Sequence, residues 1–103
     1  MAIVMQMHWP EATKELYEQV RAHADWEGDR PQGGQLHLVG WAEDGMRITD
    51  IWDSADGFQA FFEARVMPVV KDAGMTTEPE VHIFELYGVY APAFGATVPT
   101  ASV

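Results

Sequence analysis

Residues 35–53, QLHLVGWAEDGMRITDIWD, are the stretch that decides the fold. Two runs rich in β-branched and aromatic residues flank the pair Asp44-Gly45. Asp-Gly between such runs is a strong signal for a two-residue hairpin turn. We therefore predict an antiparallel pair of strands over residues 35–43 and 46–53.

The turn also sets the register in which the two strands pair. Counting outward from Asp44-Gly45 places His37 opposite Trp52 and makes His37 and Asp50 diagonal neighbours. Side chains alternate between the faces of a sheet with a period of two. One face therefore carries His37, Val39, Trp41, Ile48, Asp50 and Trp52, and the other carries Leu36, Leu38, Gly40, Arg47, Thr49 and Ile51.

One strand and one helix are predicted on each side of this hairpin. Upstream, residues 3–8 form a short apolar run typical of a strand, and residues 13–24 repeat apolar side chains at helical spacing. Downstream, residues 54–74 have the same helical pattern, in which Pro68 should kink the helix or end its first segment. Residues 81–90 are predicted to form the last strand.

The order β-α-β-β-α-β predicts an α+β, ferredoxin-like domain with a four-stranded antiparallel sheet. Right-handed crossovers place both helices on one face of that sheet. We expect a single domain over residues 1–92 and a flexible C-terminal tail over residues 93–103. The long loop over residues 25–34 is expected to border a site, with Trp26 buried against it.

Two helices can cover only one face of such a sheet, although both faces of the hairpin carry large apolar side chains. A bare apolar face usually marks an interface. We therefore predict a homodimer in which two sheets pack against each other around a two-fold axis. Which face lines a pocket and which lies in the interface stays open at this point.

Composition restricts the partners of this chain. Its 103 residues include 6 basic and 16 acidic side chains, a net charge of −10, which disfavours binding to nucleic acids and to anionic membranes. The chain has no cysteine, so neither disulfides nor thiolate chemistry are available. No apolar run reaches the roughly 18 residues needed to span a bilayer. We expect a cytoplasmic protein with neither nucleic acid nor a membrane as partner.

Several short segments resemble the dimeric α/β-barrel superfamily, in particular small actinobacterial proteins near the antibiotic-biosynthesis monooxygenases. The resemblance covers residues 2–92 and rests on the segments VMQM (4–7), LHLVGW (36–41), TDIWDS (49–54), FQAF (58–61) and VMP (66–68).

The resemblance implies a homodimer whose two sheets form a barrel, with a pocket between sheet and helices in each subunit. Relatives include cofactor-free oxygenases of aromatic polyketides, haem-degrading enzymes, polyketide cyclases and stress-induced proteins. The oxygenases use an Asn-Trp-His or a Tyr-Trp type of site. This chain supplies Trp and His but contains no asparagine.

His37 and Asp50 are the candidate catalytic residues. A carboxylate beside an imidazole fixes its tautomer and raises its basicity, which makes a general base for an activated C–H or a phenol. Trp41 and Trp52, on the same face, would form a flat wall for an aromatic ligand. The alternative is that Asp50 bonds a loop amide or Arg65 and that His37 is a packing residue.

Further side chains are candidates for binding the substrate. Arg65 could hold Asp50 or anchor a carboxylate or phenolate, although an arginine here can also lay its stem on apolar surface. Tyr17, Met5 and Met7 are candidate pocket residues, with core packing as the alternative for each. His23, Met46, Tyr87 and Tyr90 are further candidates, with the same alternative.

No metal and no cofactor are expected. The four histidines lie on separate predicted elements, without the spacing of a metal motif. Haem binding through a single histidine is left open.

Two functions remain. The first is a cofactor-independent monooxygenase, cyclase or isomerase acting on an aromatic or polyketide-like substrate, with His37 as base and Asp50 as its orienting partner. The second is a non-catalytic homodimeric module that binds a small hydrophobic molecule or acts in a stress response.

Overall fold

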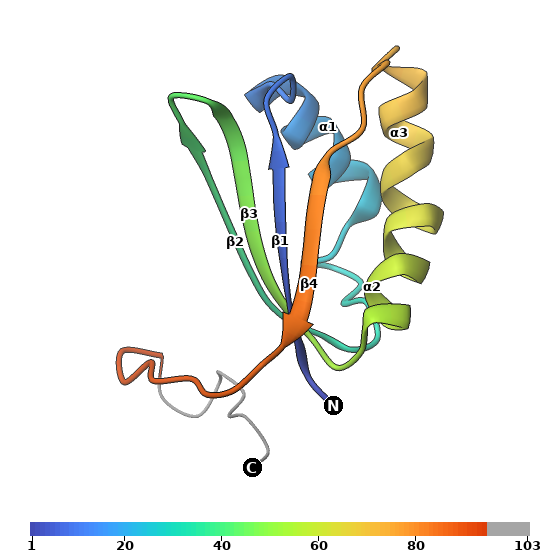
Figure 1. Ribbon diagram of the computed structural model, residues 1–103. Helices are drawn as coiled ribbons and strands as arrows, with labels where there is room; N and C mark the ends of the chain where they lie inside the picture. The colour runs from blue at the N-terminus through green and yellow to red at the C-terminus, as the bar shows by residue number, and fades with distance from the viewer. Residues whose placement is uncertain (95–103) are drawn as a thin grey trace.

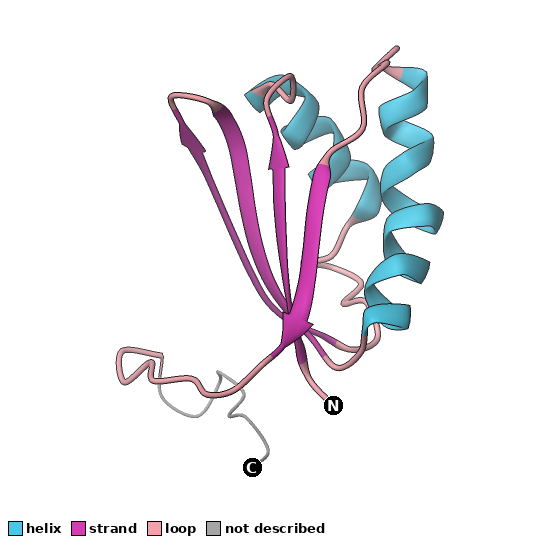
Figure 2. Ribbon diagram, in the orientation of Figure 1, coloured by secondary structure: helices cyan, strands magenta, loops and turns pink. Residues whose placement is uncertain are grey.

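The structure, a computed structural model, describes residues 1–94 and has one antiparallel sheet with its helices packed on one face (Figure 1; Figure 2). In chain order the elements are β1 (Ile3–Trp9), α1 (Lys14–Ala24), β2 (Gly34–Ala42), β3 (Gly45–Trp52), α2 (Ala55–Phe61), a π-helical turn η1 (Phe62–Val66), α3 (Met67–Asp72) and β4 (Glu80–Glu85). The four strands lie in the order β2-β3-β1-β4, and every neighbouring pair is antiparallel. This is the strand order of the ferredoxin-like fold, so the predicted fold class is confirmed.

A hydroxyl side chain caps the start of each helical segment. Thr13 Oγ1 accepts a hydrogen bond from the backbone N–H of Leu16 at 3.1 Å, and Ser54 Oγ accepts one from the N–H of Gly57 at 3.1 Å. Such caps satisfy N–H groups that have no partner within the first turn. None of the helices in residues 1–94 is long and apolar enough to cross a membrane.

The second helical segment continues past Pro68, and α2, η1 and α3 follow one another without a sharp bend in Figure 1. The predicted break takes the form of the π-helical turn η1, which lies just before Met67 and Pro68. A proline has no N–H and its ring crowds the preceding turn, so it is tolerated only in the first turn of a helix. The wider π-helical turn η1 ends the α-helical hydrogen bonding of α2. Pro68 then lies in the first turn of α3.

The register predicted for the hairpin is wrong by two residues. The turn consists of Glu43 and Asp44, since Ala42 pairs with Gly45, and His37 therefore lies directly opposite Asp50 instead of Trp52. The assignment of side chains to faces survives, because a shift of two residues matches the period of the pleat.

Gly45 explains why the turn closes one residue earlier. Its φ of 112° is a left-handed conformation that favours glycine, and a Cβ built on it would collide with the Cα of Pro10. The glycine of the Asp-Gly pair is thus needed as the first residue of β3, where the end of β1 passes close to it.

The sheet face that carries His37 and Asp50 is the face covered by the helices. The core between them is formed largely by Met5, Met7, Trp9, Leu16, Val20, Met46, Ile48, Trp52, Phe58, Val66 and Val70. This settles which face lies beside the helices, and it is there that a pocket can form.

The other face, called the open face below, carries no helix in the described chain and has one apolar row across all four strands, in which Ile51 is buried at 6% exposure. Leu36 pairs with Ile51, Ile51 with Val4, and Val4 with Phe84. Phe84 is 48% exposed and Leu38, beside this row, is 53% exposed. The homodimer predicted to cover this face stays a prediction.

The last strand is shorter than predicted, since β4 ends at Glu85 and not at Tyr90. The chain beyond it leaves the sheet and extends away from it in Figure 1, with Tyr87 and Tyr90 exposed. Leu86 makes one further backbone hydrogen bond, to the carbonyl of Ala2 at 3.0 Å. Most of the predicted flexible tail, residues 95–103, lies outside the described residues.

Candidate active site

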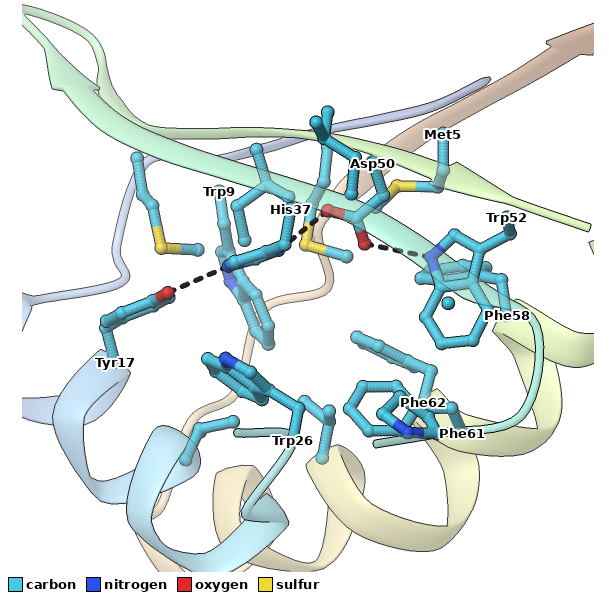
Figure 3. A pocket seen from close by; sticks show the side chains of 18 of the residues that line it. Met5, Trp9, Tyr17, Trp26, His37, Asp50, Trp52, Phe58, Phe61 and Phe62 are labelled. Atoms are coloured by element: carbon cyan, nitrogen blue, oxygen red, sulfur yellow. Dashed lines mark hydrogen bonds and ion pairs between the residues drawn. The ribbon is translucent and has the colours of Figure 1, made fainter. Parts of the chain in front are cut away.

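A cavity of about 270 Å³ lies between the sheet and the helices. Side chains from β1, α1, the loop after it, β2, β3 and the second helical segment line it, and most of them are apolar or aromatic (Figure 3). Small-molecule sites typically measure about 300–1,000 Å³ and combine apolar walls with a few polar groups, so this cavity suits a compact ligand. Met5 and Met7 of β1 line it, as predicted, and so does Met46.

The polar groups on the sheet side of the cavity form one hydrogen-bonded chain (Figure 3). His37 Nδ1 lies 2.7 Å from Asp50 Oδ1, and His37 Nε2 lies 2.8 Å from the hydroxyl oxygen of Tyr17. Trp52 Nε1 donates to the second carboxylate oxygen, Asp50 Oδ2, at 3.0 Å. The structure thus brings together four residues that the sequence nominated for the site.

The corrected register explains this arrangement. His37 on β2 and Asp50 on β3 are directly opposite. Such pairs generally have Cβ atoms about 4.5–5.5 Å apart, closer than a diagonal pair. Trp52 is two residues further along β3 and therefore on the same face. Tyr17 comes from α1, which crosses above this part of the sheet.

Donor and acceptor roles follow from the carboxylate. Asp50 is 6% exposed and, when ionised, can only accept hydrogen bonds. The proton of the neutral imidazole is therefore assigned to Nδ1, which donates it to Asp50, and Nε2 accepts the hydroxyl proton of Tyr17. Burial raises the pKa of Tyr17 to about 12, and nearby Arg21 only partly opposes this, so the phenol keeps its proton at neutral pH.

Trp26, in the loop after α1, packs against the hydrogen-bonded side chains of His37 and Tyr17. Its ring centroid lies 5.1 Å from that of His37, 5.8 Å from that of Tyr17 and 6.4 Å from that of Phe61. The sequence predicted that this loop borders a site, because it is long, rich in Gly, Pro and Asp, and contains a tryptophan. Trp26, Arg30 and Pro31 of this loop line the cavity.

Trp41 and Arg65 do not line the cavity, and their predicted substrate-binding role is corrected. Trp41 lies behind Tyr17, with ring centroids 5.7 Å apart and edge to face, and its Nε1 donates to the carbonyl of Ala12 at 3.1 Å. It therefore supports Tyr17 instead of forming a wall.

Arg65 is directed away from Asp50, its predicted partner. Its Nη1 donates to the carbonyls of Ala24 at 3.0 Å and Asp29 at 2.8 Å, and its Nη2 pairs with the Asp29 carboxylate at 3.3 Å. These carbonyls belong to the end of α1 and the loop that carries Trp26, so Arg65 anchors that loop from the second helical segment.

Other candidates lie elsewhere. His23 is exposed and lines a separate shallow groove beside α3, and Tyr87 and Tyr90 are exposed beyond β4. Several residues of the cavity wall were not predicted from the sequence: Trp9, Arg30, Gln35, Phe58, Phe61 and Phe62. Trp9 could have been predicted from the alternation of side chains along residues 5–9, which places it on the same face as Met5 and Met7. The phenylalanines could have been predicted from the apolar stripe of the second helical segment.

No protein-family model matches the chain, and no curated protein matches it significantly. Solved structures do match. A candidate antibiotic biosynthesis monooxygenase from Deinococcus radiodurans superposes with a TM-score of 0.58 at 17% identity, over 88% of this chain and 97% of that one. A variant of SnoaB, a cofactor-independent oxygenase from Streptomyces nogalater, gives 0.57 at 14% identity, over 85% and 94%.

A dimeric ferredoxin-like protein of unknown function from Thermobifida fusca gives a TM-score of 0.56 at 17% identity, over 84% of this chain and 92% of that one. Identities this low are informative about architecture, and reactions differ widely within one fold. The expected resemblance therefore holds at the level of the fold: this chain has the ferredoxin-like architecture of the antibiotic-biosynthesis-monooxygenase-like structures.

Proposed function

We propose that this protein is an enzyme that removes a proton from a compact aromatic or enolisable substrate, polyketide-like in its chemistry, without a bound cofactor. The single observation that carries the proposal is the hydrogen-bonded pair of His37 and Asp50 at the wall of an otherwise apolar cavity. A buried carboxylate that accepts the Nδ1 proton holds the imidazole in one tautomer and stabilises the imidazolium that forms when the ring takes a second proton.

The walls of the cavity support a flat, apolar substrate. Trp26, Phe61 and Phe62 provide aromatic faces opposite the sheet, against which a flat ring system would stack. The Asp50 carboxylate is buried, so the positive charge that develops on His37 lies beside an ionised partner that has little water around it.

The step after deprotonation depends on the substrate. An anion rich enough in electrons can reduce oxygen directly, which gives a monooxygenase; one with an internal electrophile cyclises, and one that is reprotonated elsewhere isomerises. The fold shared with the oxygenase SnoaB supports the first course. All three courses begin with the same proton transfer, so that transfer is the step to test.

We further propose a homodimer that covers the open face of the sheet. The apolar row from Leu36 to Phe84 supports it, as does the dimeric ferredoxin-like protein from Thermobifida fusca, which has the same architecture.

The experiment is an exchange assay that needs no knowledge of the natural substrate. 2-Tetralone, an aryl-fused ketone with acidic hydrogens at C1, is incubated with the protein in D₂O, and deuterium uptake is followed by mass spectrometry. We expect exchange above the buffer rate, and a loss of about 100-fold or more in His37→Gln, the size usual for a general base. The matched control is His23→Gln, at an exposed histidine outside the cavity.

The alternative, a non-catalytic binding module, makes the opposite prediction. It requires that 2-tetralone quench tryptophan fluorescence equally in the wild type and His37→Gln while neither protein accelerates exchange. That pair of results would contradict the proposed enzyme.

A further inference from the structure

The imidazole of His37 has no free nitrogen in this structure. Nδ1 lies 2.7 Å from Asp50 Oδ1 and Nε2 lies 2.8 Å from the hydroxyl oxygen of Tyr17. With the proton on Nδ1, the lone pair of Nε2 is already used to accept the Tyr17 hydroxyl proton. A substrate in the cavity therefore meets no open basic nitrogen.

Asp50 already accepts a hydrogen bond on each carboxylate oxygen. One of its oxygens accepts from His37 and the other accepts from Trp52 Nε1 at 3.0 Å. The residue is 6% exposed and lines the cavity, but protonating it would remove the ionised acceptor that both of these N–H donors use. Its role is to hold the imidazole of His37 in one orientation through the hydrogen bond to Nδ1.

Tyr17 is the remaining member of the hydrogen-bonded group, and its hydroxyl oxygen can still accept a hydrogen bond. A hydroxyl that donates one hydrogen bond keeps lone-pair capacity, and in residues 1–94 the structure gives this oxygen no partner besides His37. The side chain lines the cavity. Trp26 and Trp41 pack against its ring at centroid distances of 5.8 Å and 5.7 Å, which holds the hydroxyl in place.

We propose that Tyr17 is a catalytic residue that receives the substrate proton and passes its own to His37, an inference that rests on the proposed function. The substrate C–H or O–H bond breaks as its proton moves onto the Tyr17 oxygen. In the same step the original Tyr17 O–H bond breaks as that proton moves onto His37 Nε2. The substrate keeps the electron pair as an enolate or phenolate, Tyr17 is again a neutral phenol, and His37 becomes an imidazolium beside Asp50. No oxidant or reductant takes part.

A solvent isotope effect distinguishes this relay from direct attack by His37. Removal of a carbon-bound proton by an imidazole lone pair moves no solvent-exchangeable hydrogen, whereas the relay moves the hydroxyl hydrogen of Tyr17. The probe is 2-tetralone labelled with tritium at C1, and the measurement is tritium release into H₂O and into D₂O. We expect slower release in D₂O for the wild type, a result that needs no variant to fold.

The variant Tyr17→Phe removes only the hydroxyl oxygen and keeps the ring between the two tryptophans. We expect it to release tritium on the order of 100-fold more slowly than the wild type, in keeping with the loss of an acid–base group. Its residual rate should be the same in H₂O and D₂O. The matched control is Tyr87→Phe, which alters an exposed tyrosine beyond β4 and should keep both the rate and the isotope effect.

The two proposals fail in different ways. Equal wild-type rates in H₂O and D₂O, or full activity in Tyr17→Phe together with loss in His37→Gln, overturn the relay and leave His37 as the direct base. Wild-type release no faster than that of His37→Gln contradicts the proposed function, and the relay with it.

Discussion

Asp50 is the one charged side chain buried in the described part of the chain, and its environment is fully hydrogen-bonded. A buried charge is costly unless partners replace the water that it loses. His37 and Trp52 supply those partners, and the buried indole N–H of Trp52 would itself be unsatisfied without the carboxylate. The site and the stability of β3 therefore depend on the same three side chains.

Replacing Asp50 by Asn should destabilise the fold. An amide offers only one acceptor oxygen, so one of the two N–H donors loses its partner, which costs about 1–3 kcal/mol for a buried group. The free energy of unfolding from urea denaturation measures this. Asp72→Asn, at an exposed position at the end of α3, should stay within about 0.5 kcal/mol of the wild type. Equal stabilities for the two variants would show that the pair contributes nothing.

The half-buried phenol of Tyr17 should make stability fall at alkaline pH. Its pKa in the folded protein is about 12 against an ordinary 10.0, so the unfolded chain loses this proton first as the pH rises. The contribution is complete below pH 10 and is lost as the pH approaches 12. Denaturation of the wild type and Tyr17→Phe at several pH values should show their difference in unfolding free energy shrinking over that interval. A difference independent of pH would contradict the raised pKa.

At the scale of elements, a loop and a turn hold the site in shape. The loop between α1 and β2 brings Trp26 over His37, and the guanidinium of Arg65 fastens that loop to the second helical segment. The hairpin turn sets the register that brings His37 opposite Asp50, and Gly45 fits beside Pro10 where no larger residue can.

Removing the anchor of the loop should loosen the cover of the cavity. In Arg65→Ala the carbonyls of Ala24 and Asp29 lose their donor. We expect faster amide hydrogen exchange over residues 25–33 and weaker binding of 2-tetralone, with the fold retained. Lys71→Ala, on the exposed surface of α3, is the control and should alter neither measurement. Unchanged amide hydrogen exchange in Arg65→Ala would indicate that the loop keeps its conformation without the contacts of Arg65.

The hairpin should tolerate alanine at Gly40 but not at Gly45. Gly45 has φ 112° and faces the backbone of Pro10, so an alanine there adds both backbone strain and a collision, together more than about 1–3 kcal/mol. Nothing lies within 4 Å of a Cβ built on Gly40. Gly40→Ala should therefore be neutral or slightly stabilising. Thermal denaturation of both variants provides the comparison, and similar losses would refute this account of the turn.

At the scale of the whole molecule, the two faces of the sheet have different roles. One face meets the helices and lines the cavity, whereas the other carries the apolar row that ends in Phe84. A second copy of the chain is the proposed cover for that row.

A charge on the open face should separate the proposed dimer. Phe84→Glu places a carboxylate within the apolar row, where burial against a partner would leave it unpaired. Sedimentation velocity should give a dimer for the wild type and a monomer for this variant. Ala60→Glu, at an exposed position on α2, should remain dimeric. A monomeric wild type would contradict the proposed assembly.

Much of the site could be predicted because it depends on local rules. Alternation along the two strands of the hairpin placed His37, Asp50 and Trp52 on one face, and this assignment survived an error of two residues in register. Arg65 and Trp41 were misassigned because their partners, Asp29 and Ala12, are distant in sequence. Spacing along one element cannot reveal such a partner.

The sequence by itself determined the ferredoxin-like architecture and the set of side chains on each face of the hairpin, since both follow from the periodicity of the pattern and the order of the elements. Only the tertiary structure decided that Tyr17 joins His37 and that Trp26 covers them. These contacts depend on how α1 and its following loop lie over the sheet, and that placement is set by packing across the core and by anchors such as Arg65.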